Sequence, residues 1–276
     1  RRYGDHFYPN ISGVGRSLNY YPLDDERAEE GTVSLALGLG KYIVDGGRTL
    51  RVCPAHPARV LQTSDTEMAL RETQTRFCAL DLKNMGENFS VDDGFNLLRL
   101  PVKVADADGA LQFIASTFNP TDQVIYPGLY PGGRKIISFV GVLEHDVVPL
   151  PQIMSEVLQM GEEAMRRPVE IEFAVEIDAK NRSCVFYLLQ IRPMVDVRTE
   201  VNIDLSAIDP ARVLLRSDNA LGHGNFDDLT DVVYVKTDDY SAGNNPLIAE
   251  EIEHLNAGFL AEGRHYVLIG PGRWGS

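Results

Sequence analysis

The residues with the most distinctive chemistry in this chain lie in a segment that has the alternating pattern of a β-strand. Residues 169–176 read Val-Glu-Ile-Glu-Phe-Ala-Val-Glu, so apolar and acidic side chains largely alternate. Successive side chains of a strand point to opposite faces, which places Glu170, Glu172 and Glu176 on one face and the apolar residues on the other. Carboxylates on a shared face offer the hard oxygen ligands that magnesium prefers.

A second strand-like segment follows, in which residues 186–193 read Phe-Tyr-Leu-Leu-Gln-Ile-Arg-Pro. Gln190 and Arg192 share one face of it because they are two positions apart. If residues 178–184 fold the two strands into a hairpin, the carboxylates and the Gln/Arg pair meet on one polar surface. The sequence therefore predicts a site for magnesium and a polyphosphate.

Antiparallel pairing fixes which residues of the two strands stand opposite each other. The numbers of paired residues add to a constant sum, so pairing Glu172 with Gln190 also pairs Glu170 with Arg192. Magnesium usually takes one or two carboxylates and completes its shell with phosphate and water, and Glu172 with the Gln190 oxygen suits that role. The alternative is that the strand face binds no ligand and is simply exposed to solvent. Glu170 and Arg192 would then form a surface ion pair that contributes at most about 1 kcal/mol to stability.

Composition and charge narrow the class of protein. The 276 residues are 44% hydrophobic and 24% charged, a composition that predicts a globular protein. No uninterrupted apolar run approaches the roughly 18 residues that would predict a membrane span. Forty acidic against 26 basic residues give a net charge of −14, which repels phosphates and disfavours the binding of nucleic acid. A nucleoside triphosphate would be repelled too, so its binding would need a local cation and a magnesium ion to offset the charge. Cys53, Cys78 and Cys184 have no disulfide or zinc spacing and no signal peptide is visible, so we expect a cytoplasmic protein.

The periodicity of apolar residues predicts the elements around the hairpin. Apolar residues spaced by three and four predict helices, and runs of β-type residues predict strands. The expected helices span residues 66–82, about 108–118, 149–166 and about 246–260, and the expected strands span residues 135–143, 232–236 and 266–269. The last strand-helix-strand series reads as a β-α-β unit that packs separately, after a change in composition at Pro193.

The hairpin sequence resembles the end of the nucleotide-binding domain of phosphoenolpyruvate synthases and pyruvate phosphate dikinases. The family pattern is Pro, an apolar residue, Asp or Glu, an apolar residue, Glu and an aromatic, followed by Tyr-x-x-Gln-x-Arg-Pro. Residues 168–173 and 187–193 match this pattern. The resemblance implies an α+β, ATP-grasp-like fold that binds ATP and magnesium.

The resemblance also implies a role for each polar residue of the hairpin. Glu172 looks like the magnesium carboxylate, and Gln190 like a second contact to the metal or to phosphate. Arg192 is similar to the family's catalytic cation, which contacts the phosphate groups during phosphoryl transfer. Glu170 stands at the less strictly metal-binding acidic position, so it ranks below Glu172 as a ligand.

Residues 33–47 resemble the same family's Gly-Leu-Gly-Glu-x-x-Val-x-Gly stretch, which implies nucleotide contacts from Gly38, Gly40 and Lys41. Here Lys41 replaces the familiar glutamate, which removes an acidic contact and adds a point cation. Taken alone, Gly-Leu-Gly is more often a turn than a phosphate cradle. For Arg16, in the strand that precedes this stretch, we expect a solvent-facing structural role ahead of a phosphate contact.

The resemblance covers roughly residues 9–57 and 134–195 and leaves a helix-containing insertion at about 58–133 unaligned. We therefore expect residues 1–196 to be the carboxy-terminal portion of an ATP-grasp nucleotide-binding domain. We expect residues 197–276 to form a smaller α/β unit, and the chain to be a fragment at both ends.

The implied function is the ATP-binding part of an ATP-dependent phosphotransferase, in which phosphoryl passes from ATP to a histidine carrier and on to pyruvate. The carrier and the pyruvate-binding domain have no counterpart here, so pyruvate or phosphoenolpyruvate would meet other domains and the fragment alone is expected to be inactive. Two alternatives stay open. One is a dikinase-type phosphotransferase with another acceptor, and the other is a non-catalytic nucleotide-sensing or interaction module, which Lys41 and the unaligned insertion favour.

Overall fold

The chain forms two compact units, Arg1–Asp196 and Val197–Ser276. The structure is a computed structural model. It describes residues 1–23, 25–83, 94, 96–178, 180–194, 208–217, 226, 228–238, 240–241 and 244–271. Across these described residues, no helix is both long enough and apolar enough to cross a membrane.

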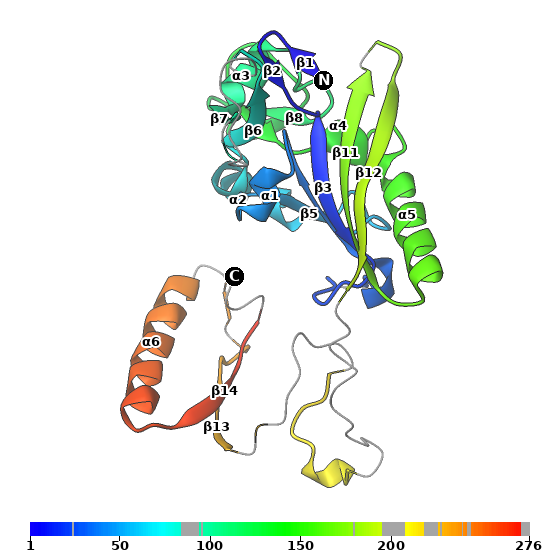
Figure 1. The fold of residues 1–276 in the computed structure, drawn as a ribbon. Coiled ribbons are helices and arrows are strands. Elements are labelled where there is room, and N and C mark those ends of the chain that lie inside the picture. The colour runs from blue at the N-terminus through cyan, green and yellow to red at the C-terminus, as the bar shows by residue number, and fades with distance from the viewer. Residues whose placement is uncertain are drawn as a thin grey trace. The chain divides into compact units, whose positions relative to one another are not determined.

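The largest sheet of the first unit has five antiparallel strands in the order β12-β11-β3-β4-β5 (Figure 1). Its strands are β3 (Ile11–Arg16), β4 (Thr32–Ala36), β5 (Leu50–Val52), β11 (Val169–Asp178) and β12 (Ser183–Pro193). Strands β11 and β12 form the predicted hairpin. The hairpin lies beside β3, so segments from opposite ends of the unit meet in one sheet.

Two smaller antiparallel sheets contain the other strands found in the described residues of the first unit. One has four strands, β1 (Arg2–Tyr3), β2 (His6–Phe7), β6 (Arg76–Asp81) and β7 (Leu97–Pro101). The other has three strands in the order β10 (Arg134–Ile137), β8 (Ala115–Asn119) and β9 (Val124–Pro127). Antiparallel sheets combined with helices confirm the predicted α+β class.

The helices of the first unit are mostly short. In the part of this unit that the structure describes they are α1 (Lys41–Val44), α2 (Thr66–Glu72), α3 (Val102–Ala107), α4 (Val140–Leu143) and α5 (Leu150–Met165), with 3₁₀ turns at Ala28–Glu30 and Leu61–Thr63. Helix α5 has 16 residues and confirms the helix predicted over residues 149–166. It buries Met154 and Leu158, and its Gly161 approaches Ile191 so closely that a Cβ there would lie 2.7 Å from the isoleucine Cδ1.

The hydrophobic core lies under one face of the five-stranded sheet. The core-facing residues of β11 are Val169, Ile171, Phe173, Val175 and Ile177, and all are buried. The Phe173 ring stacks on Phe186 with 4.8 Å between ring centroids, and it fills the space left by the missing side chain of Gly13. Each fully buried side chain of this size contributes roughly 1.5–3 kcal/mol, so the apolar residues of β11 hold this face inward and leave its acidic residues on the other.

The prediction of one helix over residues 66–82 was wrong, because α2 ends at Glu72 and β6 begins at Arg76. Between them, the Gln74 side chain accepts a hydrogen bond from the Leu37 N–H at 2.8 Å and donates one to the Leu37 carbonyl at 2.9 Å. This long-range contact interrupts the helix. The apolar residues that follow are buried on a strand instead.

Two other predicted elements were also wrong. The helix expected near residues 108–118 lies earlier, as α3, and is followed by Gly109 with φ of +69° before β8 begins. The strand expected over residues 135–143 ends at Ile137, and Phe139, with φ of +52°, starts α4. A left-handed residue redirects the chain in both places.

The second unit contains a parallel strand pair joined through one helix. Strands β13 (Leu229–Tyr234) and β14 (His265–Ile269) pair in parallel, and α6 (Asn245–Ala261) connects them. A 3₁₀ turn at Pro210–Arg212 precedes them. The predicted β-α-β unit is confirmed in these described residues.

Candidate functional site

The hairpin has the register that its residue types predict. Glu172 pairs with Gln190, and Glu170 pairs with Arg192. The register shifts at an irregularity between Glu172 and Phe173, directly after the first of these pairs. Bulges of this kind increase the local twist and re-aim side chains, and they are common beside functional sites.

Two rows of mostly polar side chains extend from the hairpin across the five-stranded sheet. Directly paired residues of neighbouring strands point to the same face, so the register of each strand pair places these residues together. The first row contains Arg192, Glu170, Arg16 and Thr32, and the second contains Gln190, Glu172, Val14, Ser34 and Arg51. We call the polar members of these two rows the polar strip.

Glu170 is the buried centre of the first row, with 8% of its surface exposed. One carboxylate oxygen accepts a hydrogen bond from Arg16 Nε at 2.7 Å. The other accepts one from Arg192 Nε at 2.9 Å and a second from Arg192 Nη2. Both oxygens of this predicted metal ligand are therefore engaged by guanidinium groups from the strands on either side.

The opposite charges in the first row shift the pKa values of Glu170 and Arg192 so that both groups stay ionised. Burial alone would raise the pKa of Glu170, but the hydrogen bonds and charges of Arg16 and Arg192 outweigh burial, and its pKa lies below the ordinary value. The hydrogen bonds to Glu170 in turn raise the pKa of Arg192. Two guanidinium groups and one carboxylate give this row one net positive charge, and Glu172 of the next row also acts on Arg192.

Glu172 and Gln190 form the other predicted rung and keep their polar atoms available. Glu172 is half-buried and Gln190 is exposed. Within the part of the chain that the structure describes, neither side chain has a hydrogen-bond partner or an ion pair. A carboxylate beside an amide oxygen suits a magnesium ion that takes its remaining ligands from phosphate and water. Among the described residues no cluster of three or more His, Cys, Asp or Glu gathers to hold a metal by itself.

The Gly38–Lys41 segment lies on the same face of the sheet, further along β3. The Ser12 hydroxyl, which is on that face, donates a hydrogen bond to the Gly38 carbonyl. Arg16 lies four positions after Ser12 on β3, a distance of about 13 Å along the strand. The glycine segment and the hairpin rungs are thus brought onto one surface, but they are not in contact.

Lys41 is the first residue of α1, and it is paired within its own helix. Its Nζ forms an ion pair with Asp45, which also accepts a hydrogen bond from Arg99 Nη2 at 3.0 Å. Gly40 precedes the helix as its N-cap residue. Four residues give α1 too small a dipole to serve as an anion site, so a phosphate contact here would rest on Lys41 and the backbone.

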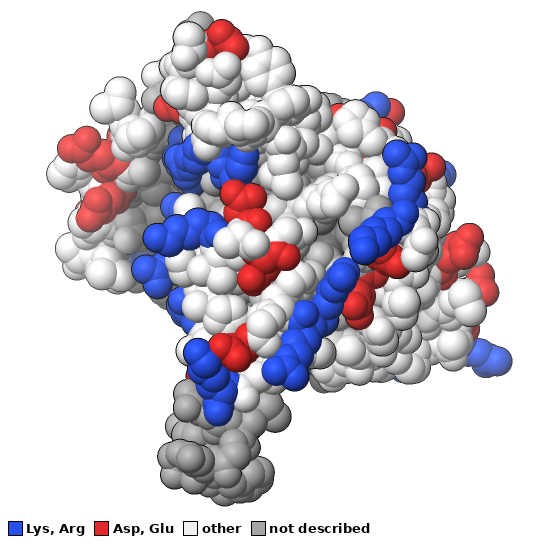
Figure 2. All heavy atoms as spheres, turned by 90° about the horizontal axis from the view of Figure 1, so that it is seen from above, with Lys and Arg blue, Asp and Glu red and all other residues white. Residues whose placement is uncertain are grey.

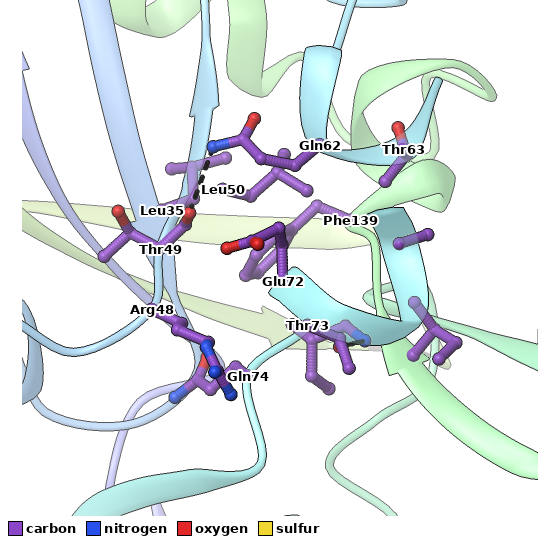
Figure 3. Close-up of a pocket in the computed structure, with 13 residues that line it drawn as sticks. Leu35, Arg48, Thr49, Leu50, Gln62, Thr63, Glu72, Thr73, Gln74 and Phe139 are labelled. Atoms are coloured by element: carbon purple, nitrogen blue, oxygen red, sulfur yellow. Dashed lines mark hydrogen bonds between the residues drawn. The ribbon is translucent and has the colours of Figure 1, made fainter. Parts of the chain in front are cut away.

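Two cavities of the first unit lie away from the predicted residues. One, between β5, α2 and Phe139, has a volume of about 10 Å³, room for roughly one water, and Gln62 closes it with a hydrogen bond to the Thr49 carbonyl (Figure 3). The other has a volume of about 680 Å³ and is lined by Arg1, Asp108, Glu176 and Cys184 among others. Neither of these two cavities is lined by Glu170, Glu172, Gln190 or Arg192, which share a face of the five-stranded sheet.

The surface carries both signs of charge close together. On the face shown in Figure 2, Lys and Arg side chains form a row with Asp and Glu side chains beside it. Basic side chains therefore gather locally on this face although the net charge of the chain is −14.

Reasoning from the sequence missed Thr32 and Arg51 at the far end of the polar strip. Arg51 Nε donates a hydrogen bond to Thr32 Oγ1 at 3.0 Å, and its Nη2 donates to Asn19 Oδ1. The available signal was Leu50-Arg51-Val52, a basic residue between two apolar residues, which is typical of a half-buried strand.

A comparison with protein families places this geometry in context. A family model described as pyruvate phosphate dikinase, AMP/ATP-binding domain, matches residues 5–207. The match includes the polar strip, the Gly38–Lys41 segment and residues 58–133, and the antiparallel sheets are consistent with an ATP-grasp-like α+β domain. No curated protein matches the chain. The chain belongs to the family of the pyruvate phosphate dikinase AMP/ATP-binding domain, which confirms the resemblance seen in the sequence.

Proposed function

We propose that the polar strip binds ATP with magnesium, as part of an ATP-dependent phosphotransferase of the phosphoenolpyruvate synthase and pyruvate phosphate dikinase type. The observation that carries the proposal is the rung of Glu172 and Gln190 beside Arg192. The Glu172 carboxylate and the Gln190 amide oxygen lie beside the Arg192 guanidinium group on one face of the sheet. Membership of an AMP/ATP-binding domain family supports the nucleotide as the ligand.

Each residue of the hairpin has a distinct proposed role. Glu172 and the Gln190 side-chain oxygen would hold magnesium, which would supply positive charge to the phosphates of the nucleotide. Arg192 donates hydrogen bonds to the phosphoryl group as charge moves onto the leaving oxygen. Glu170 would have to release a guanidinium group to reach the metal, so its contribution is to orient Arg192.

The Gly38–Lys41 segment is assigned to the other end of the nucleotide. It lies about 13 Å along β3 from Arg16, on the same face of the sheet, so one extended ligand can contact both places. In this arrangement the backbone of Gly38 and Gly40 approaches the nucleoside end. Lys41 exchanges part of its contact with Asp45 for an oxygen of the phosphate that is attached to the nucleoside.

The proposed reaction transfers phosphoryl from ATP to a histidine of a carrier domain, and from there to pyruvate. The P–O bond between the transferred phosphoryl group and the rest of the nucleotide breaks while the P–N bond to histidine forms, and the nucleotide leaves with the bonding electron pair. The strip therefore supplies positioning and charge stabilisation without covalent chemistry of its own. A dikinase with another acceptor would use the same strip. A non-catalytic nucleotide sensor is favoured by Lys41, which replaces the family's glutamate.

Calorimetric titration of the full-length protein with ATP, with and without magnesium, tests the proposal. We expect magnesium-dependent binding that is lost in Glu172→Ala and strongly weakened in Arg192→Ala. Incubation with ATP then separates the alternatives, because the phosphotransferase forms an acid-labile phosphohistidine and the sensor does not. Absence of ATP binding by the intact protein would refute both nucleotide functions.

A further inference from the structure

Arg16 on β3 has no part in the roles assigned above, although it touches the centre of the polar strip. We propose that Arg16 is a second phosphate-binding cation, which with Arg192 holds the terminal phosphates of the nucleotide from the two sides of Glu170. This inference rests on the proposed function of the strip. It assigns a ligand contact to a residue that sequence reasoning expected to be structural.

The hydrogen bonds of the two arginines leave donors available to a ligand. A guanidinium carries five N–H donors in a rigid plane. Arg16 uses only its Nε toward Glu170, and Arg192 uses Nε and Nη2. In the described residues, both terminal nitrogens of Arg16 and the Nη1 of Arg192 have no partner.

The burial of the three side chains orients those donors outward. The Glu170 side chain is 10% exposed, whereas those of Arg16 and Arg192 are 49% and 58% exposed. Glu170 therefore lies beneath the two cations and fixes their inner edges through hydrogen bonds. Each outer edge has the geometry that binds phosphate oxygens in a bidentate manner.

Charge balance explains why two cations stand here rather than one. A single guanidinium already neutralises Glu170, so ion pairing within the protein accounts for only one arginine. The second adds a positive charge that Glu170 does not balance and that Glu172, in the next row, offsets only from a distance, and bringing two guanidinium groups to one carboxylate costs mutual repulsion. A phosphate that carries two or more negative charges removes that repulsion.

The position of the pair relative to the proposed metal ligands fits a terminal phosphate. Arg16 and Arg192 belong to the row that is two residues, or about 7 Å, from the rung of Glu172 and Gln190. A polyphosphate held at the second row would be long enough to reach the free donors of Arg16 and Arg192 in the first row. ATP affinity should therefore depend on Arg16, whereas AMP affinity should not, because AMP lacks the terminal phosphates.

The test compares ATP with AMP as probes, both with magnesium, on the full-length protein. We expect Arg16→Gln to weaken ATP binding about 10- to 100-fold, the range for losing charge-assisted hydrogen bonds, and to change AMP binding less than about twofold. Arg16→Lys, which keeps the charge without the planar fork, should fall between these values. Arg71→Gln, which removes an exposed arginine paired with the neighbouring Glu72, is the matched control and should bind both nucleotides normally.

The outcomes separate the inference from the proposed function. ATP binding by Arg16→Gln at wild-type affinity overturns the inference and leaves the proposed function standing. Equal weakening of ATP and AMP also overturns it, because Arg16 then acts only by supporting the site. If the wild-type protein binds no ATP, the proposed function itself fails, and the inference with it. Should Arg16→Gln fail to fold by circular dichroism, the ratio of ATP to AMP affinity in Arg16→Lys decides in the same way.

Discussion

Glu172 and Gln190 pair directly across the β11–β12 ladder, at the last rung before its register shifts. Their side chains share one face of the sheet and have no hydrogen-bond or ion-pair partner among the described residues. We predict that Glu172→Gln, which keeps the shape and removes the charge, abolishes the magnesium-dependent part of ATP affinity. Titrations with ATP at several magnesium concentrations measure this directly.

Glu176→Gln is the matched control for that change. Glu176 lies on the same strand and face but beyond the irregularity, where it pairs with Val185. We expect its magnesium response to equal that of the wild type. A loss of the same size in both variants would show that general surface charge, and not a metal ligand at Glu172, controls binding.

Glu170→Gln should destabilise the protein, because Arg16 and Arg192 would then stand side by side without their buried counter-ion. We expect the free energy of unfolding to fall by about 1–3 kcal/mol, less than for a fully buried pair because both arginines are half exposed. Urea denaturation followed by circular dichroism measures the change. Glu72→Gln, which breaks an exposed pair, should stay close to wild type, and equal stability of all three proteins would contradict a structural role for Glu170.

The local features of the site could be predicted from the sequence because they depend on short-range rules. Strand alternation and a constant residue sum are enough to pair Glu172 with Gln190 once the hairpin is assumed. Helix α5 was equally accessible, since its apolar residues keep a helical period over four turns. Neither feature needs information from distant parts of the chain.

The remaining features depend on contacts between distant segments. Arg16 meets Glu170 only because β3 pairs with β11, and the short β3 segment does not reveal its partner or its register. Likewise, the apolar spacing of residues 66–82 fits a helix, and the contact of Gln74 with Leu37 decides against it. Non-local pairing therefore limited both the site and the fold prediction.

The three cysteines are predicted to react slowly with alkylating reagents in the native protein. Burial raises the pKa of the Cys53, Cys78 and Cys184 thiols, so little of the reactive thiolate is present near pH 7.5. Cys53 and Cys78 are also buried from the reagent, whereas Cys184 is half-buried. Mass spectrometry after iodoacetamide treatment should find Cys184 labelled first and the other two only after denaturation.

The denatured protein is the control, in which all three thiols should react at one rate. Native labelling of Cys53 as fast as in denaturant would contradict the packing described for β5 and its neighbours. Because none of these thiols lies in the polar strip, labelling of Cys184 should leave ATP affinity unchanged.

The two glycines of the Gly-Leu-Gly stretch are predicted to tolerate alanine very differently. Gly38 has φ of +88°, and a Cβ there would lie 2.6 Å from the Cys78 carbonyl oxygen. Gly40 has φ of −57°, and its nearest neighbour would be the Ser12 Cβ at 3.9 Å. We expect Gly38→Ala to lower the free energy of unfolding by at least about 2 kcal/mol, and Gly40→Ala by less than about 1 kcal/mol.

Gly40→Ala therefore separates the requirement of the fold from that of the ligand. The backbone at residue 40 leaves room for a methyl group, so a glycine is not needed there for packing. If the nucleotide approaches this backbone as proposed, Gly40→Ala weakens ATP binding several-fold while its thermal unfolding stays near that of the wild type. Unchanged affinity in a stable Gly40→Ala protein would remove Gly40 from the binding surface and leave the hairpin rungs as the part of the site that contacts ATP.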